Sequence, residues 1–218
     1  MTRESFDRQL SDLQDDLLTL GSMVEKAILS SVDALAHRDV QLAEQIISDD
    51  AKLDDLRYRI EEECLLLFAT QQPMATDLRV IASTMIIAGE LERMGDHAEG
   101  IAKICVRIGE DQLLKPLIDI PRMAQRVAEL LHIVLEAFVQ RDTERATWVC
   151  QQDDEIDSLY HQVFRELLTF MIEDPRTISR ATYLIWVAHN IERIGDRVTN
   201  VAERIIFMAT GRLERLNL

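Results

Sequence analysis

An internal repeat constrains this chain more than any other feature of its sequence. The segment LERMGDHAEGIA at residues 91–102 matches IERIGDRVTNVA at residues 191–202, an offset of 100 positions. Upstream matches recur at an offset of 103 positions: Arg38-Asp39 with Arg141-Asp142, and Asp50-x-x-Leu53-Asp54 with Asp153-x-x-Ile156-Asp157. A repeat of this length indicates two copies of one structural unit, each of roughly a hundred residues.

Each unit has the pattern of three long helices. Apolar residues recur at helical spacing throughout, and the chain holds only 7 Gly and 4 Pro, too few for the turns of a sheet protein. Asp39 and Asp142 are placed as N-caps of the helices that follow them, and Pro73 and Pro175 mark the next breaks. The expected helices span roughly 4–37, 40–70 and 76–109 in the first unit, and 121–140, 143–172 and 176–212 in the second.

These helices predict an all-α fold, a tandem repeat of two antiparallel three-helix bundles similar to spectrin repeats. Short loops between long helices favour antiparallel neighbours. We expect the first bundle at residues 1–109, a linker at residues 110–121 that contains Pro116, and the second bundle at residues 122–218.

The charge and the cysteines restrict the functions open to the chain. The formal net charge is −15, so the average surface repels nucleic acid and attracts metal ions or basic partner surfaces. Cys64, Cys105 and Cys150 lie in apolar helical runs without a CxxC pair, which is typical of buried free thiols in a reducing compartment. The sequence has no signal-peptide pattern and no apolar stretch of about 20 residues. We therefore expect a soluble cytoplasmic protein that binds no nucleic acid and does not insert into a membrane.

Four pairs of carboxylates at i, i+4 spacing occupy equivalent places in the two units. They are Asp50/Asp54, Glu92/Asp96, Asp153/Asp157 and Glu192/Asp196. Like charges one turn apart destabilise an isolated helix, so each pair needs a cation, a pairing arginine or full solvation. Asp50 lies between Ile46 and Leu53 on an apolar stripe, and Asp153 holds the equivalent place in the second unit. The expected packing face therefore carries a carboxylate in both copies.

A bundle that packs its second helix on its third would gather two pairs into a cluster of four carboxylates. A cluster without counter-charge raises the pKa values of its members, and a hard cation such as Mg²⁺, Ca²⁺, Mn²⁺ or iron is the usual solution. Two other interpretations stay open: the pairs are simply solvated, or Arg93 and Arg193 pair with them. His161, one turn after Asp157, is a weaker candidate ligand because Tyr58 stands at its place in the first unit.

Three features of the sequence belong together: the E-R-[MI]-G-D core at residues 92–96 and 192–196, the segment MATDLR at residues 74–79, and the Arg38-Asp39 junction. They resemble the PhoU family, and the resemblance extends from about residue 5 to about residue 210. The resemblance implies a tandem of three-helix bundles that forms homodimers. It also implies a multinuclear metal site, with iron as the first choice and Zn, Mn, Mg or Ca as alternatives.

The metal ligands that the resemblance implies are the four carboxylate pairs and one amide. In this chain they are Asp50, Asp54, Glu92, Asp96, Asp153, Asp157, Glu192, Asp196 and Asn200. Gly100 stands at the place equivalent to Asn200 in the first unit, and we expect Glu99 to substitute from the neighbouring position. The second site is therefore predicted to be better formed than the first.

The resemblance also implies a regulator and not an enzyme. A PhoU-like protein is expected to link the ATPase subunit of a phosphate ABC transporter to a sensor histidine kinase. It damps phosphate uptake and the transcriptional response to phosphate starvation when phosphate is plentiful. The alternative is a metal-dependent phosphohydrolase that uses the carboxylate clusters, although the sequence has no Gly-rich phosphate loop and no nucleophile–base pair. A plain helical scaffold with solvated carboxylates is the third hypothesis.

Overall fold

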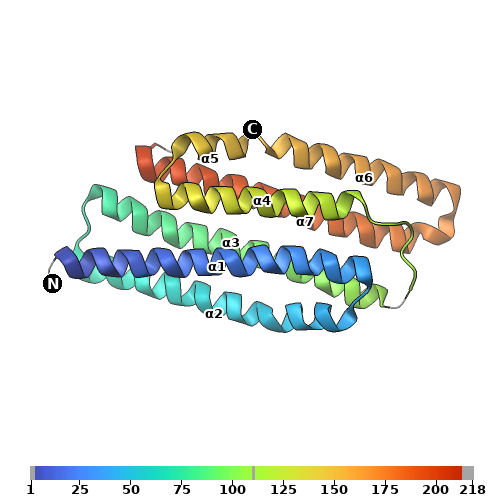
Figure 1. Ribbon diagram of the computed structural model, residues 1–218, viewed down its shortest axis with the longest axis horizontal. Coiled ribbons are helices and arrows are strands. Elements are labelled where there is room, and N and C mark those ends of the chain that lie inside the picture. Colours follow the sequence, from blue (N-terminus) through green and yellow to red (C-terminus); the bar gives the residue numbers. More distant parts are fainter. Residues whose placement is uncertain (1–2, 110, 213–218) are drawn as a thin grey trace.

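In the computed structural model, which describes residues 3–109 and 111–212, the chain folds into helices without any strand (Figure 1). The first repeat contains α1 (Arg3–His37), α2 (Val40–Gln71) and α3 (Ala75–Ile108). The second contains α4 (Asp119–Gln140), α5 (Thr143–Cys150), α6 (Asp153–Glu173), the short 3-10 helix η1 (Pro175–Thr177) and α7 (Ile178–Thr210). The predicted all-α tandem of helical bundles is confirmed. The predicted unit limits at residues 1, 110 and 218 lie outside the described residues.

The turn after the first helix of each repeat is built from the same two residues. Arg38 and Arg141 adopt left-handed backbone, with φ of 57° and 53°. The aspartate that follows each of them caps the next helix. Asp39 Oδ1 and Asp142 Oδ1 each accept a hydrogen bond of 2.9 Å from the backbone N–H three residues later. The predicted N-caps are confirmed, and they explain why α2 and α5 begin where they do.

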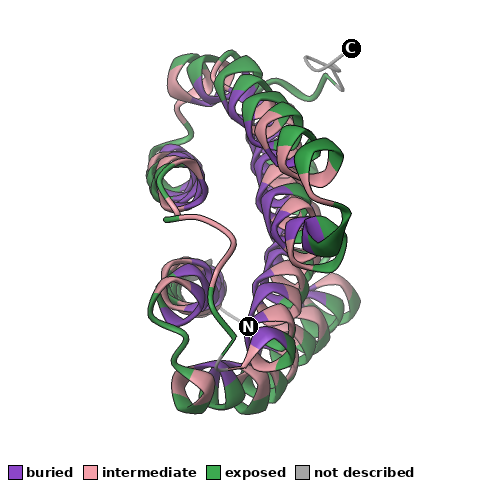
Figure 2. Ribbon diagram, turned by 90° about the vertical axis from the view of Figure 1, so that its right-hand side faces the viewer, coloured by how far each residue is buried: buried purple, intermediate pink, exposed green. Residues whose placement is uncertain are grey.

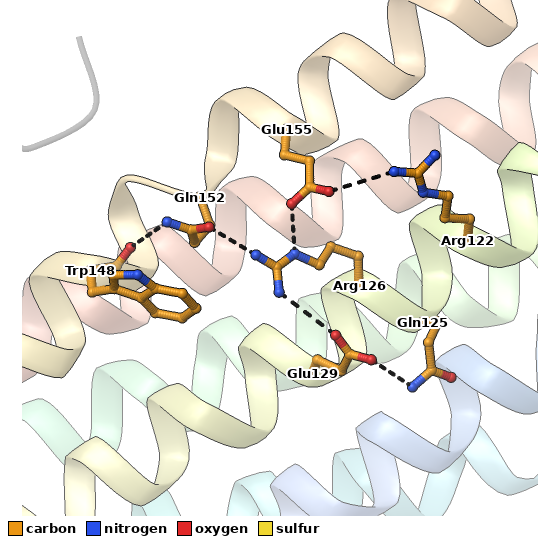
Figure 3. A network of polar contacts seen from close by, with 7 residues as sticks. All are labelled: Arg122, Gln125, Arg126, Glu129, Trp148, Gln152 and Glu155. Carbon is orange, nitrogen blue, oxygen red and sulfur yellow. Dashed lines mark hydrogen bonds and ion pairs between the residues drawn. The ribbon is translucent and has the colours of Figure 1, made fainter.

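The helix predicted at residues 143–172 is wrong in one respect, because the structure breaks it into α5 and α6 at Gln151-Gln152. This turn contains neither Gly nor Pro, so its sequence does not signal a break. Arg126 of α4 holds it from outside: Nη2 donates to Gln152 Oε1 and Nε donates to Glu155 Oε2, both at 2.8 Å (Figure 3). The other predicted helix ends differ from the observed ones by at most two residues.

The third helices of the two repeats, α3 and α7, pack antiparallel along each other. Near one end of the pair, Arg79 Nε donates to Met208 O at 3.2 Å. Farther along, Arg197 Nη1 donates to Glu90 Oε2 at 3.3 Å. Residue numbers thus rise along α3 as those of their partners fall along α7. This is expected for two repeats related by an approximate twofold axis.

The first helices, α1 and α4, form a second antiparallel pair. Gly21 lies against Leu135, and Glu25 lies near His132, which is three residues earlier on α4. α1 and α4 make up one layer, and α3 and α7 make up the other (Figures 1 and 2). α2 flanks the layers in the first repeat, and α5 and α6 flank them in the second.

One hydrophobic core runs through both repeats. Leu17 and Ile101 of the first repeat and Val134 and Ile194 of the second belong to the same cluster and are fully buried. The purple inner faces in Figure 2 mark this core between the two layers. No helix within the described residues is both long and apolar enough to cross a bilayer. The carboxylates of interest therefore lie on a frame that burial of apolar surface holds in place.

Candidate carboxylate clusters for cations

The first cluster lies where α2 packs on α3. It consists of the predicted residues Asp50, Asp54, Glu92 and Asp96, with Glu99 beside them. Gly95 allows the close approach of the two helices. A Cβ at this position would lie 3.1 Å from Leu53 Cδ1 and 3.6 Å from Asp50 Oδ1. Because Gly95 has no side chain, the Asp50 carboxylate lies directly against α3.

Burial and mutual repulsion raise the pKa values in this first cluster. Burial comes first for Asp50, and the neighbouring carboxylates add to it, so that its pKa is raised to about 6. The pKa values of Glu92 and Asp96 are raised for the same two reasons, again with burial first. Lys103 Nζ lies 2.5 Å from Glu99 Oε2 and offsets part of the repulsion. The cluster still favours a further positive charge.

The second cluster lies at the equivalent place, where α6 packs on α7. It consists of the predicted residues Asp153, Asp157, Glu192 and Asp196. Asp153 is only 6% exposed. A Cβ at Gly195 would lie 3.6 Å from Asp153 Oδ1 and 3.4 Å from Ile156 Cγ2. The glycine of each E-R-[MI]-G-D core therefore has the same role in both repeats, which is to bring an aspartate of the preceding long helix against the third helix.

Glu192 is the most perturbed carboxylate of the second cluster. Burial first, and then the charge of Asp196, raise the pKa of Glu192 to about 7. Its Oε2 is buried and accepts no hydrogen bond from the described residues. His189 Nδ1 lies 3.3 Å away, but burial and the nearby Arg193 lower the pKa of His189, which disfavours the charged imidazolium that would balance the carboxylate. Burial and Asp196 likewise raise the pKa of Asp157.

Each arginine of the repeated motif forms an ion pair. Arg193 Nη1 lies 2.5 Å from Asp196 Oδ2, inside the second cluster. Arg93 Nη1 instead lies 3.3 Å from Glu90 Oε1, away from the first cluster. Within the clusters, an arginine therefore forms a direct ion pair with Asp196. Arg57 and Arg93 oppose the rise in the pKa of Glu92, and Arg193 opposes the rise in the pKa of Glu192, but both pKa values stay raised.

The remaining predicted ligands lie at the margins of the clusters. Asn200 is directed into the α3–α7 interface, where its Nδ2 donates to Glu90 Oε2 at 3.1 Å. It lines a cavity of about 490 Å³ together with Asp196. His161 is exposed, and its nearby charge opposes the rise in the pKa of Asp157.

Sequence reasoning missed His189. The signal was available as the spacing His189-x-x-Glu192, which places both side chains on one face of α7. Gly89 occupies the equivalent position of the first repeat. The second cluster therefore has a nitrogen donor at its edge that the first cluster lacks there.

The donor atoms of these clusters suit a hard cation, but their present arrangement does not. The donors are carboxylate oxygens, the ligands that hard cations prefer, and burial followed by mutual repulsion raises the pKa values of Asp50 and Glu192. However, no three His, Cys, Asp or Glu side chains within residues 3–109 and 111–212 converge closely enough to hold a metal ion. Binding would require the carboxylates to change rotamer.

Comparison with known proteins gives consistent matches over the whole chain. The family model described as PhoU domain matches residues 17–105 and again residues 120–205. A "Phosphate-specific transport system accessory protein PhoU homolog" of Clostridium acetobutylicum is 41% identical over 218 residues, all of both chains. A protein of the same description from Rhizobium meliloti is 41% identical over 211 residues, which cover 95% of this chain and 88% of that protein.

Two crystal structures share the fold. The structure of PhoU from Pseudomonas aeruginosa superposes with a TM-score of 0.90 at 35% identity, covering 95% of this chain and all of that chain. The structure of the phosphate transport system regulatory protein PhoU from Streptococcus pneumoniae superposes with a TM-score of 0.89 at 31% identity, covering 96% and 99% of the two chains.

Proposed function

The chain belongs to the PhoU family, and we propose that it is a non-catalytic accessory protein of phosphate transport. The observation that carries this proposal is the match over the full chain, at 41% identity, to a relative named as an accessory protein of phosphate-specific transport. The PhoU domain model supports the proposal, because it matches each of the two helical repeats of this chain.

In finer terms, the protein is a negative regulator that links the ATPase subunit of a phosphate ABC transporter to a sensor histidine kinase. The acidic surface, with a net charge of −15, suits basic partner surfaces. The protein acts in the cytoplasm, where both partners present their soluble parts, and it works as a homodimer.

The partner proposal is tested by pulldown. The tagged full chain is mixed with the purified ATPase subunit of the transporter and, separately, with the cytoplasmic part of the sensor kinase, with and without inorganic phosphate. We expect saturable binding to both, with phosphate strengthening the kinase complex. Failure to bind either protein under any condition would overturn the adaptor function.

The two clusters are also proposed to bind metal, with iron first and Zn, Mn, Mg or Ca as alternatives. Support comes from the raised pKa values and from the buried Oε2 of Glu192, which accepts no hydrogen bond from the described residues. The residues that would hold the ions are the four carboxylate pairs. A bound cation would supply the missing positive charge and tie α2 to α3 and α6 to α7.

Elemental analysis and thermal unfolding test the metal proposal without any activity assay. The protein is chelated, reloaded with one metal at a time and dialysed. The variant D153N/D157N/E192Q/D196N should lose about half of the bound metal and the associated rise in Tm. The matched control D12N/D15N/E62Q/E173Q removes the same charge from exposed positions and should keep both. Equal metal content in the two variants would refute the assignment.

A further inference from the structure

The two repeats differ in the direction that the arginine of the E-R-[MI]-G-D core takes. Arg93 Nη1 lies 3.3 Å from Oε1 of Glu90, which stands one turn earlier on α3 and away from the first cluster. Arg193 Nη1 lies 2.5 Å from Asp196 Oδ2, inside the second cluster. The two arginines hold equivalent positions of the repeat, so the cause of the difference lies in the residues around them.

The residue one turn before each arginine explains the difference. In the first repeat it is Glu90, whose carboxylate attracts Arg93. In the second repeat it is Asn190, which carries no charge and whose amide is engaged at both ends. Its Nδ2 donates to a backbone carbonyl of its own helix at 2.8 Å, and its Oδ1 accepts from His97 Nδ1 at 2.9 Å. Arg193 therefore finds no carboxylate at this place and pairs within the cluster instead.

The opposite repeat holds Glu90 in place. Arg197 Nη1 and Asn200 Nδ2, both of α7, lie 3.3 Å and 3.1 Å from Glu90 Oε2. Arg93 lies against the other oxygen, Oε1. The Glu90 side chain is only 12% exposed, so its carboxylate is fixed between α3 and α7 with one oxygen directed to Arg93.

The second cluster therefore contains an internal cation in direct contact with one of its carboxylates. The four carboxylates of the first cluster that have counterparts in the second form no ion pair within the part of the chain that the structure describes. Lys103 pairs with Glu99, a fifth carboxylate without a counterpart in the second repeat. Arg57 and Arg93 act on Glu92 without an ion pair, and its pKa stays raised.

We propose that Glu90 is a positioning residue that keeps Arg93 out of the first cluster, and that this cluster therefore binds an added divalent cation more tightly than the second. A cation that enters the second cluster must displace the guanidinium of Arg193 from Asp196, whereas the four carboxylates of the first cluster hold no such partner. This order is the reverse of the one expected from Asn200, which donates to Glu90. The inference rests on the proposed binding of metal and adds which of the two sites fills first.

The two clusters can be measured one at a time with Mn²⁺ as the probe. The variant D153N/D157N/E192Q/D196N keeps only the first cluster, and D50N/D54N/E92Q/D96N keeps only the second. Each protein is chelated and titrated with Mn²⁺, and free Mn²⁺ is followed by electron paramagnetic resonance. We expect the first cluster to bind Mn²⁺ at least about tenfold more tightly than the second.

The two arginines provide a matched pair of variants. Arg193→Gln and Arg93→Gln make the same change in net charge at equivalent positions of the repeat. In the protein that keeps only the second cluster, Arg193→Gln should strengthen Mn²⁺ binding by about tenfold, because the internal cation is removed. In the protein that keeps only the first cluster, Arg93→Gln should strengthen it by less than about threefold.

The role of Glu90 is tested by rescue. In the protein that keeps only the first cluster, Glu90→Gln releases Arg93 and should weaken Mn²⁺ binding by about tenfold. Adding Arg93→Gln should restore the affinity, whereas a loss of packing between α3 and α7 would not be restored by this second substitution. Circular dichroism checks that each variant is folded. Absence of the rescue would overturn the role of Glu90.

Three further results would overturn the inference. Equal or tighter binding at the second cluster contradicts the proposed order. Equal strengthening by the two arginine variants would mean that net charge alone sets the affinity. Both results leave the proposed metal binding intact. No saturable binding of Mn²⁺ to either protein would overturn the inference and, if iron(II) gives the same result, the metal proposal as well.

Discussion

Glu90 of α3 accepts a hydrogen bond from Asn200 of α7 across the interface between the two repeats, at 3.1 Å. Arg197 Nη1 lies 3.3 Å from the same carboxylate oxygen. At the equivalent place on the other side of the approximate twofold axis, His97 Nδ1 lies 2.9 Å from Asn190 Oδ1. Since that amide oxygen can only accept, His97 Nδ1 is the donor. Polar contacts of different chemistry thus join the repeats at two equivalent points.

Replacing Glu90 by Ala should lower the free energy of unfolding by about 1–3 kcal/mol, because the half-buried Arg197 would lose its carboxylate partner. The side chains of Glu90 and Arg197 are 12% and 21% exposed. Urea unfolding followed by circular dichroism measures the change. Lys52→Ala, which breaks an ion pair whose side chains are 67% and 43% exposed, is the control and should stay within about 0.5 kcal/mol of the wild type. Equal effects of the two substitutions would contradict the interpretation.

Arg126→Ala should loosen the turn between α5 and α6. The substitution removes the hydrogen bonds to Gln152 and Glu155 and the contact of the guanidinium with the Trp148 ring, 5.8 Å from its centroid (Figure 3). Amide hydrogen exchange at residues 151–155 should become about tenfold faster, since each lost kilocalorie of local stability raises the open population several-fold. Arg122 is a matched control, because its side chain is 65% exposed and lies 3.9 Å from Glu155. Arg122→Ala should leave exchange in this turn nearly unchanged.

Gly21 and Gly89 should respond in opposite ways to alanine. A Cβ at Gly89 meets nothing within 4 Å, so Gly89→Ala should raise the free energy of unfolding by about 1 kcal/mol through helix propensity alone. A Cβ at Gly21 would overlap Leu135, which is buried. Gly21→Ala should therefore lower the free energy of unfolding by about 1–3 kcal/mol, despite the same gain in helix propensity. Thermal and urea unfolding of the two variants give the comparison. The prediction fails if both variants are stabilised equally.

In the metal-free protein, stability should fall as the pH rises through neutrality. The pKa of Glu192 is raised from 4.5 to about 7, so the folded chain holds this proton more tightly than the unfolded chain. Its contribution is fully present below the unfolded pKa and is lost as the pH passes the folded pKa. Between about pH 5 and about pH 8, the free energy of unfolding should fall by on the order of 1–2 kcal/mol through this group. Asp50, with its pKa raised to about 6, adds to the same trend.

The variant Glu192→Gln isolates this contribution. Its free energy of unfolding should depend less on pH, and at about pH 8 it should exceed that of the wild type. Glu62→Gln, at an exposed position on α2, should follow the wild-type curve. A pH profile of Glu192→Gln that parallels the wild type would show that the charge of Glu192 does not destabilise the folded state.

The parts of the structure that depend on local chemistry could be predicted from the sequence. Asp39 and Asp142 cap their helices as expected, because a cap needs only the backbone N–H groups that follow it. The carboxylate pairs also come together where the second and third helices of each repeat pack, because Asp50 and Asp153 lie on the apolar stripes that face Gly95 and Gly195. The break at Gln151-Gln152 was missed, since it depends on Arg126 of another helix.

The place of Asn200 illustrates the same limit. Its spacing from Asp196 is one helical turn, which says that the two side chains share a face of α7. It does not say that Glu90 of α3 will lie opposite and accept the amide proton, because that contact depends on how the two repeats pack. The association of the carboxylates with metal stays a prediction.

The contacts of Glu90 and Asn190 also distinguish pairing of the two repeats within one chain from pairing of repeats between separate chains. If two first repeats from separate chains paired in this manner, Glu90 would face His97, and if two second repeats paired, Asn190 would face Arg197 and leave the guanidinium without a carboxylate. Pairing within one chain joins the carboxylate to the guanidinium and the amide to the imidazole. Divergence of the duplicated halves at these positions therefore favours closure of each chain on itself over the exchange of halves between chains.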